Sequence, residues 1–191
     1  MKSKYYYLPI IEWMEVVNFL VKFHCIARWE EVIELKKSDL KFLENGDCVI
    51  TFVKGKCNQF HDANQVTLAA SGNRYCPVNI LKTYLLVIRS DLDHYLFPRI
   101  SRGKVYLSEK ASYKYCLDRL RGALERVGVT NFRDFGEHSD RVGAASLAAN
   151  EGISTDMLQV QGRWASEEMP KRYHKKSKQK KRLISNLFNR V

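Results

Sequence analysis

The chain has no apolar run that approaches the ~20 residues of a membrane-spanning helix. Its start, MKSKYYYLPIIEW, lacks the apolar core and small residues of a secretory signal peptide. Hydrophobic residues nevertheless make up 45% of the 191 positions, which is enough for a well-packed domain. We therefore expect a globular, intracellular protein.

Cysteine is scarce and scattered. The five cysteines, at positions 25, 48, 57, 76 and 116, are odd in number and form no CxxC pair. This pattern favours reduced, mostly buried thiols and supports neither a disulfide framework nor a zinc site. The sequence also has no internal repeat, low-complexity segment or obvious linker, and we expect no bound metal.

Acidic residues are in deficit, because 21 Asp and Glu face 32 Lys and Arg for a net charge of +11. A polyanionic partner is the natural interpretation. Nucleic acid is favoured over a membrane because no strongly amphipathic basic helix with an aromatic face stands out. A merely soluble basic protein is the alternative that charge alone leaves open.

Hydrophobic periodicity predicts a mainly α-helical fold with a small antiparallel β-sheet, in the α+β class. Paired strands are expected at 48–53 and 65–69 on either side of a long turn-rich tip, and DLDHYLFPRISRGK is expected to be a loop. Helices are predicted at 9–24, around 32–35 up to Ser38-Asp39, at 77–89, at 109–127 before Gly128, at about 139–150, and from Ser154 through Gln161, where Gly162 closes the helix.

Six side chains together could perform phosphoryl transfer. Two arginines can hold one phosphodiester from two sides and stabilise the added charge of its transition state without a metal. A tyrosine phenol can act as nucleophile and later as leaving group, while lysine and histidine can move the protons. The candidates are Arg28, Lys56, His138, Arg141, Trp164 and Tyr173.

Each candidate taken alone has a simpler interpretation. Arg28 could form a surface ion pair with Glu30 or Glu31, and His138 could merely begin a helix. Trp164 could belong to the core, and Tyr173 is one of ten tyrosines. Lys54 competes with Lys56 for the lysine role. The common order and spacing of the six are what these separate interpretations do not explain.

In order along the chain, the sequence contains A-R-x-x-E at 27–31, a lysine in the predicted hairpin, H-x-x-R at 138–141, G-x-W at 162–164, and a tyrosine nine residues later. This set resembles the catalytic domain of the tyrosine recombinases, the phage-integrase-like enzymes. The segments KGKCNQ, VTLAA, CPVNILKTYL, HSDRVGAAS and GRW further resemble recombinases of DIRS-type and Crypton-type eukaryotic mobile elements.

The resemblance implies a DNA recombinase that needs no metal or nucleotide cofactor. Tyr173 would attack the scissile phosphate to give a 3′-phosphotyrosyl bond and a free 5′-hydroxyl. Arg28 and Arg141 would clamp the phosphate, Lys56 would protonate the 5′ oxygen, and His138 would assist proton transfer at the phenol. Trp164 stands where many relatives have histidine. A type IB topoisomerase-like nicking-closing enzyme and a catalytically silent DNA-binding module are the alternatives.

The end of the sequence is strongly basic, with eight Lys or Arg among residues 171–182. Such a run is a solvated tail, a nuclear-localisation signal, or a contact for the phosphates of double-stranded DNA. We expect residues 1–174 to form the catalytic domain, with no separate N-terminal DNA-gripping domain. Residues 175–191 are expected to form a basic tail with a short helix. This tail would be exchanged between the protomers of a homo-oligomer on DNA. The expected DNA contacts are Lys54, Lys171, Arg172, Lys175, Lys176 and Lys178.

Three positions depart from the family pattern. Asp140 places an acid inside the H-x-x-R motif, where it could pair with Arg141 and weaken the clamp. Asn58 and Cys57 replace residues usual in the hairpin, and we expect both changes to be tolerated.

Overall fold

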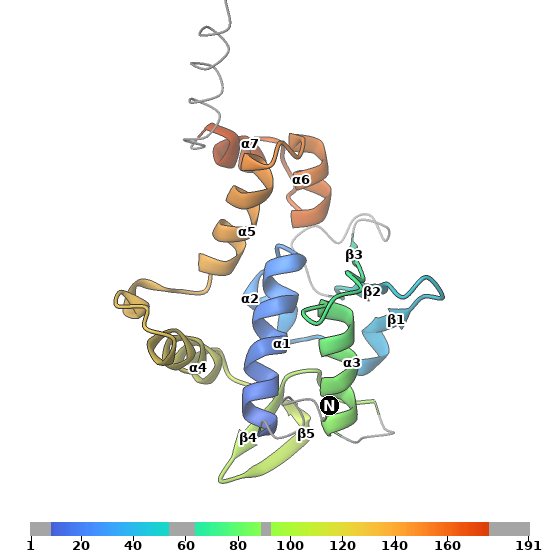
Figure 1. The fold of residues 1–191 in the computed structure, drawn as a ribbon, viewed down its shortest axis with the longest axis vertical. Coiled ribbons are helices and arrows are strands. Elements are labelled where there is room, and N and C mark those ends of the chain that lie inside the picture. The colour runs from blue at the N-terminus through green and yellow to red at the C-terminus, as the bar shows by residue number, and fades with distance from the viewer. Residues whose placement is uncertain (1–8, 54–63, 89–92, 176–191) are drawn as a thin grey trace, which may run out of the picture.

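A single helix runs through the middle of the molecule. The computed structural model describes residues 9–53, 64–88 and 93–175. Helix α1 (Ile10–His24) begins after Pro9 and buries an apolar stripe at helical spacing that includes Met14, Val17 and Val21. It packs against three longer helices, α3 (Pro77–Ile88), α4 (Tyr113–Arg126) and α5 (Ser139–Asn150), and Figure 1 shows it in blue at the centre.

A three-stranded antiparallel sheet supports one side of this core. Its strands are β1 (Leu40–Phe42), β2 (Cys48–Thr51) and β3 (Gln65–Leu68), in the order β1-β2-β3. Alternate residues of β2 and β3 face the core, so the predicted strand pair is confirmed. The sequence did not predict β1, whose three residues are only partly buried or exposed.

The sequence predicted a loop at 91–104, after α3 (Pro77–Ile88), and the second part of that prediction is wrong. Residues there form a hairpin of β4 (Pro98–Ser101) and β5 (Lys104–Lys110), joined by a turn in which both Arg102 and Gly103 have positive φ. Pro98 and Gly103 had indicated a loop. Pro98 instead begins β4, and Gly103 completes the tight turn between β4 and β5.

The remaining helices of this half are shorter than predicted. α2 (Trp29–Val32) is a single turn followed by the 3₁₀ turn η2 (Lys37–Asp39). α4 (Tyr113–Arg126) starts four residues later than predicted because β5 occupies 109 and 110 and Ser112 caps the helix. Gly128, with φ of 85°, follows its end as expected, before the 3₁₀ turn η4 (Phe132–Asp134).

Three helices form a second layer at the C-terminal end of α1: α5 (Ser139–Asn150), α6 (Thr155–Gly162) and α7 (Glu168–Lys175) (Figure 1). The alanines of α5 leave space for a small core that contains Ile26, Leu158 and Trp164, with Tyr173 packed against it. α6 begins with the predicted Ser154 cap, but Gly162 is its last helical residue and Arg163 takes the left-handed conformation that ends it.

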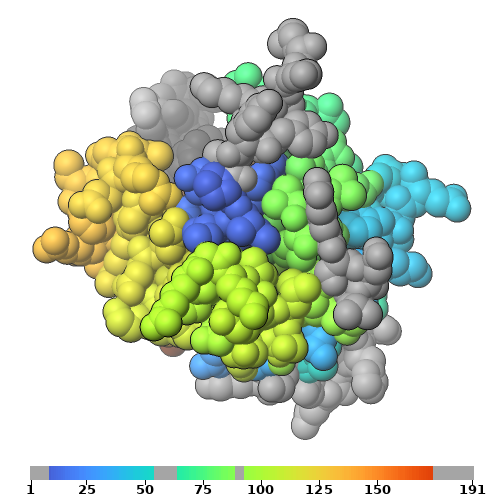
Figure 2. Space-filling model, turned by 90° about the horizontal axis from the view of Figure 1, so that it is seen from below, coloured from blue at the N-terminus to red at the C-terminus, as the bar shows by residue number. Residues whose placement is uncertain are grey.

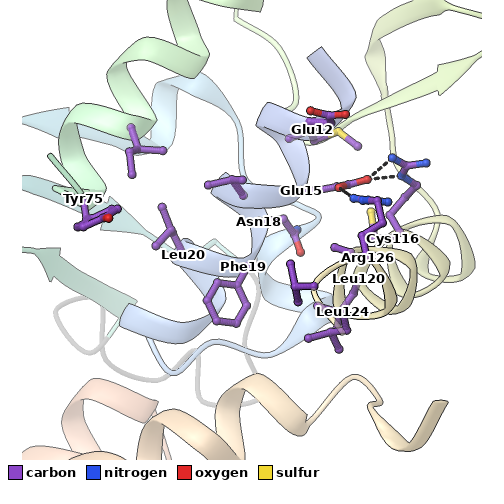
Figure 3. Close-up of a pocket in the computed structure, with 16 residues that line it drawn as sticks. Glu12, Glu15, Asn18, Phe19, Leu20, Tyr75, Cys116, Leu120, Leu124 and Arg126 are labelled. Atoms are coloured by element: carbon purple, nitrogen blue, oxygen red, sulfur yellow. Dashed lines mark hydrogen bonds and ion pairs between the residues drawn. The ribbon is translucent and has the colours of Figure 1, made fainter. Parts of the chain in front are cut away.

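An apolar groove of about 630 Å³ lies between α1 and α4 and is lined by side chains such as Phe19, Leu120 and Leu124 (Figure 3). Figure 2 shows α1 reaching the surface between α3 and α4. At the groove's edge the Glu15 carboxylate binds Arg119 and Arg126. Among the described residues, no helix combines the length and apolar character needed to cross a membrane.

Candidate active site

The site is built on the carbonyl end of α1. The last residue of α1 and the two residues after it present three successive carbonyl oxygens to side chains of the second layer. Gln161 donates to the carbonyl of His24 at 2.8 Å, Arg163 to that of Cys25 at 3.2 Å, and Arg141 to that of Ile26 at 2.6 Å. The negative end of the helix dipole favours these two cations.

Glu31 is the shared anion of the site. Its carboxylate is 3% exposed and accepts hydrogen bonds from the guanidinium of Arg28 at 2.9 Å and from that of Arg163 at 2.7 Å. The guanidinium of Arg141 lies 4.0 Å away. Burial opposes ionisation, but the charges and hydrogen bonds of Arg163 and Arg28 outweigh it and lower the pKa of Glu31.

Arg141 is almost fully buried, and its fork is held on both sides. One Nη donates to the Ile26 carbonyl and the other to the Gly162 carbonyl, each at 2.6 Å, and the guanidinium lies 4.4 Å from the centre of the Trp164 ring. Burial, followed by the charge of Arg28, lowers the pKa of Arg141 to about 10. The group stays charged at neutral pH, with N–H donors left over for an anion.

Trp164 connects this arginine to the tyrosine. The ring centroids of Trp164 and Tyr173 are 5.5 Å apart, at an interplanar angle of 33°. Tyr173 is half-buried on α7, and a nearby Tyr173 phenolate would raise the pKa of Arg141. Arg28, Arg141, Trp164 and Tyr173, from four separate parts of the chain, therefore meet in one cluster.

His138 lies outside this cluster. It is the residue before the first turn of α5, its side chain is 67% exposed, and its Nε2 lies 3.1 Å from the Glu137 carboxylate. Its part in proton transfer stays a prediction.

Asp140 does not pair with Arg141, so the expected ion pair between these two residues is wrong. Its carboxylate forms an ion pair at 2.6 Å with Lys22 of α1, and both side chains are about 95% buried or more. Successive side chains leave a helix in different directions. Asp140 therefore faces α1, while Arg141 faces Gly162 and Trp164.

The family model described as the phage integrase family matches residues 12–180. The chain belongs to this family. Its members are the tyrosine recombinases, and the observed helices and small antiparallel sheets are the fold of their catalytic domain. No curated protein sequence matches the chain.

Solved recombinases share the fold at low identity. XerH site-specific recombinase bound to palindromic difH substrate, in a post-cleavage complex, matches with a TM-score of 0.68 at 19% identity, over 95% of this chain and 51% of that one. XerA recombinase matches with a TM-score of 0.65 at 18% identity, over 94% and 60% of the two chains. The integrase of transposon Tn1549, bound to circular intermediate DNA, matches with a TM-score of 0.53 at 13% identity, over 83% and 53%. This tyrosine recombinase domain thus spans about half the length of these relatives.

The hairpin lysines Lys54 and Lys56 lie outside the described residues, as do Lys176 and Lys178. Phe52, directly after β2, lies near the site, because its ring is 4.0 Å from the guanidinium of Arg163, which binds Glu31. On α7, Arg172 is exposed and Lys171 holds the carboxylates of Glu167 and Glu168. Lys175 is the last residue of α7.

Sequence reasoning missed three charged residues in or next to the candidate site. Glu31 was noted as part of a motif and as a possible surface partner of Arg28, not as a buried anion shared by three arginines, and Lys22 and Arg163 were not singled out. The available signal for Arg163 was a long charged residue between the helix-closing Gly162 and the buried Trp164. Among the described residues no three His, Cys, Asp or Glu side chains are grouped to hold a metal ion.

Proposed function

We propose that this chain is the catalytic domain of a site-specific DNA recombinase or integrase, which cleaves and rejoins DNA through a covalent 3′-phosphotyrosyl intermediate without metal or ATP. The observation that carries the proposal is the meeting of Arg28, Arg141, Trp164 and Tyr173 at the end of α1. A tyrosine beside two arginines joins a nucleophile to a phosphate-binding clamp.

The charge of the cluster suits the reaction. Three guanidinium groups surround one carboxylate, which leaves a net charge of +2 in a largely buried site. A phosphodiester carries one negative charge, and its pentacoordinate transition state carries about one more. The positive charge of the cluster therefore matches the transition state better than it matches the bound phosphodiester. Binding the transition state more strongly than the substrate is what lowers the reaction barrier.

In the proposed reaction the Tyr173 oxygen forms a bond to phosphorus as the bond to the 5′ oxygen breaks. Lys56 gives the departing 5′ oxygen a proton, and His138 receives the phenol's proton. Arg28 and Arg141 hold the two non-bridging oxygens. The phosphotyrosyl bond retains the energy of the broken bond, so a 5′-hydroxyl can attack it and rejoin the strand.

The substrate would be double-stranded DNA, bound by a homo-oligomer. The net charge of +11 and the basic run after Tyr173 support a polyanionic partner. We place the protein with recombinases of DIRS-type and Crypton-type elements, on the hairpin, Cys-Pro and G-R-W motifs. Its location would be the nucleus in a eukaryote and otherwise the cytoplasm or nucleoid. In this proposal residues 175–191 contact DNA and link protomers.

The test is covalent capture on nicked duplexes with a randomised centre. The chain should yield complexes that survive detergent, carry a 3′-phosphotyrosyl link and map to Tyr173. A Tyr173→Phe variant should bind the recovered DNA and form no complex, while Tyr75→Phe, at an exposed tyrosine outside the cluster, should behave as the unaltered chain.

Other outcomes select the alternatives. Relaxation of supercoiled DNA by a monomer at no specific site would indicate a nicking-closing enzyme. Binding without any covalent product would indicate a silent DNA-binding module. A 5′-phosphotyrosyl link would contradict the mechanism.

A further inference from the structure

Arg163 has a backbone conformation that its side chain does not favour. Its φ is 51° and its ψ 46°, in the left-handed region where glycine is the usual residue. The side chain is nevertheless 5% exposed and turned inward. An arginine at a position suited to glycine suggests that the guanidinium has a task of its own.

The contacts of Arg163 join four parts of the site. Its guanidinium donates to the Glu31 carboxylate at 2.7 Å, to the Cys25 carbonyl at 3.2 Å and to the Gln161 carbonyl at 3.0 Å. It also stacks on Phe52 at the base of the hairpin that carries Lys56. With its plane held this way, it has no described contact with Tyr173 or Trp164.

Glu31, the ion-pair partner of Arg163, is also the carboxylate that could neutralise the clamp of Arg28 and Arg141. Glu31 lies 2.9 Å from Arg28 and 4.0 Å from Arg141, so it could neutralise either arginine. Arg163 occupies one carboxylate oxygen at 2.7 Å, closer than Arg28 is to the other. The Arg163–Glu31 pair is thus close to neutral, and the charge of Arg28 and Arg141 remains for an anion.

We propose that Arg163 is a positioning residue, the counterion that occupies Glu31 and so keeps the Arg28–Arg141 clamp positive and open to a tetrahedral oxyanion. The consequence for DNA cleavage rests on the function proposed above; the consequence for oxyanion binding does not. Without Arg163, the buried Glu31 would turn its full charge on Arg28 and Arg141.

The decisive experiment is titration calorimetry of the full chain with tungstate, a tetrahedral dianion, near pH 7. Replacing Arg163 by Gln lowers the net charge of the cluster from +2 to +1 and should weaken tungstate binding about tenfold or more. The double variant Arg163→Gln/Glu31→Gln restores +2 and should recover most of the lost affinity. Arg163→Lys keeps the charge and should lie between the unaltered chain and Arg163→Gln.

The control is Arg102→Gln. Arg102 also has a left-handed backbone, with φ of 50°, but its side chain is exposed in the β4–β5 turn. The Arg102→Gln variant should bind tungstate as the unaltered chain does. Circular dichroism of each variant shows whether the fold is retained.

Recovery in the double variant is the result that a purely structural role would not give, because that variant loses more contacts than Arg163→Gln does. A double variant that binds no better than Arg163→Gln, or an unaltered chain that does not bind tungstate, overturns the proposal. On nicked DNA the covalent yields should follow the same order. If no protein forms adducts while tungstate binding follows the predicted order, the recombinase function fails and the counterion role stands.

Discussion

Arg141 donates a 2.6 Å hydrogen bond to the carbonyl oxygen of Ile26, a β-branched residue held at a φ of 47°. This conformation is rare for such a residue and costs about 1–3 kcal/mol. It turns the chain directly after α1 so that the Ile26 carbonyl meets the arginine. The position of the Arg141 guanidinium, half of the proposed phosphate clamp, therefore depends on a strained backbone between α1 and α2.

Replacing Arg141 by Lys tests this geometry. A lysine cannot donate to the Ile26 and Gly162 carbonyls from one plane while stacking on Trp164, so stability should fall by about 2–3 kcal/mol in urea unfolding. Tungstate binding and covalent capture should also fall, despite the retained charge. Arg102→Lys is the matched control and should change neither; equal behaviour of the two variants would show that the planar fork is unimportant.

The packing of Trp164 can be disturbed through its neighbour. A Cβ on Gly162 would lie 2.5 Å from Cε3 of the indole, which is buried beside Arg141 and Tyr173. We expect Gly162→Ala to destabilise the protein by about 1–3 kcal/mol and to reduce covalent capture, because the ring must move.

The control for this change is Gly122→Ala in the middle of α4, where the new Cβ would meet only the flexible Arg126 side chain at 3.6 Å. That variant should gain up to about 1 kcal/mol. Thermal unfolding of both proteins gives the comparison. If Gly162→Ala is as stable as Gly122→Ala, the indole is not fixed as described.

The buried pair of Lys22 and Asp140 should matter far more than an exposed pair. Asp140→Asn leaves a buried ammonium without its counterion, and Lys22→Met leaves a buried carboxylate, so each should cost about 3–5 kcal/mol. The double variant should cost less than the sum of the two. The exposed α4 pair of Lys114 and Asp118 is the comparison, and Asp118→Asn should cost about 0.5 kcal/mol or less. Additive costs at Lys22 and Asp140 in urea unfolding would show that the two charges do not interact.

Local signals account for what was predictable from the sequence. The helices at α1, α3, α4, α5 and α6 follow from apolar periodicity and from residues that cap or stop them, such as Ser154 before α6 and Gly128 after α4. The order of the motifs predicted that Arg28, Arg141, Trp164 and Tyr173 belong to one site. β1 and β5 were missed because they lack a regular alternation of buried and exposed residues. β4 does alternate, but it has only four residues and begins with Pro98, which indicated a loop.

Partners that are distant along the chain were not predictable. Nothing near Asp140 in the sequence indicates that its counterion is Lys22, because that pairing exists only once α5 packs on α1. The same holds for Arg163, whose contacts are with Cys25 just after α1, Glu31 in α2 and Phe52 just after β2. Motif order predicts candidates for the reacting groups, while the charges that balance these groups are found only in the folded chain.

Glu31 should make stability depend on acid pH. Its pKa is lowered from 4.5 in the fold, so its ionised form contributes stability fully above that pH, and the contribution is lost as the pH falls through the lower, folded value. Glu31→Gln should cost about 3 kcal/mol or more at neutral pH, because Arg163 and Arg28 then lack their counterion. Its stability should fall less steeply below pH 4.5 than that of the unaltered chain. Urea unfolding at a series of pH values measures both slopes, with Glu109→Gln, in an exposed pair with Arg99, as the control. Parallel slopes for the Glu31→Gln variant and the unaltered chain would show that the arginines do not hold Glu31 ionised.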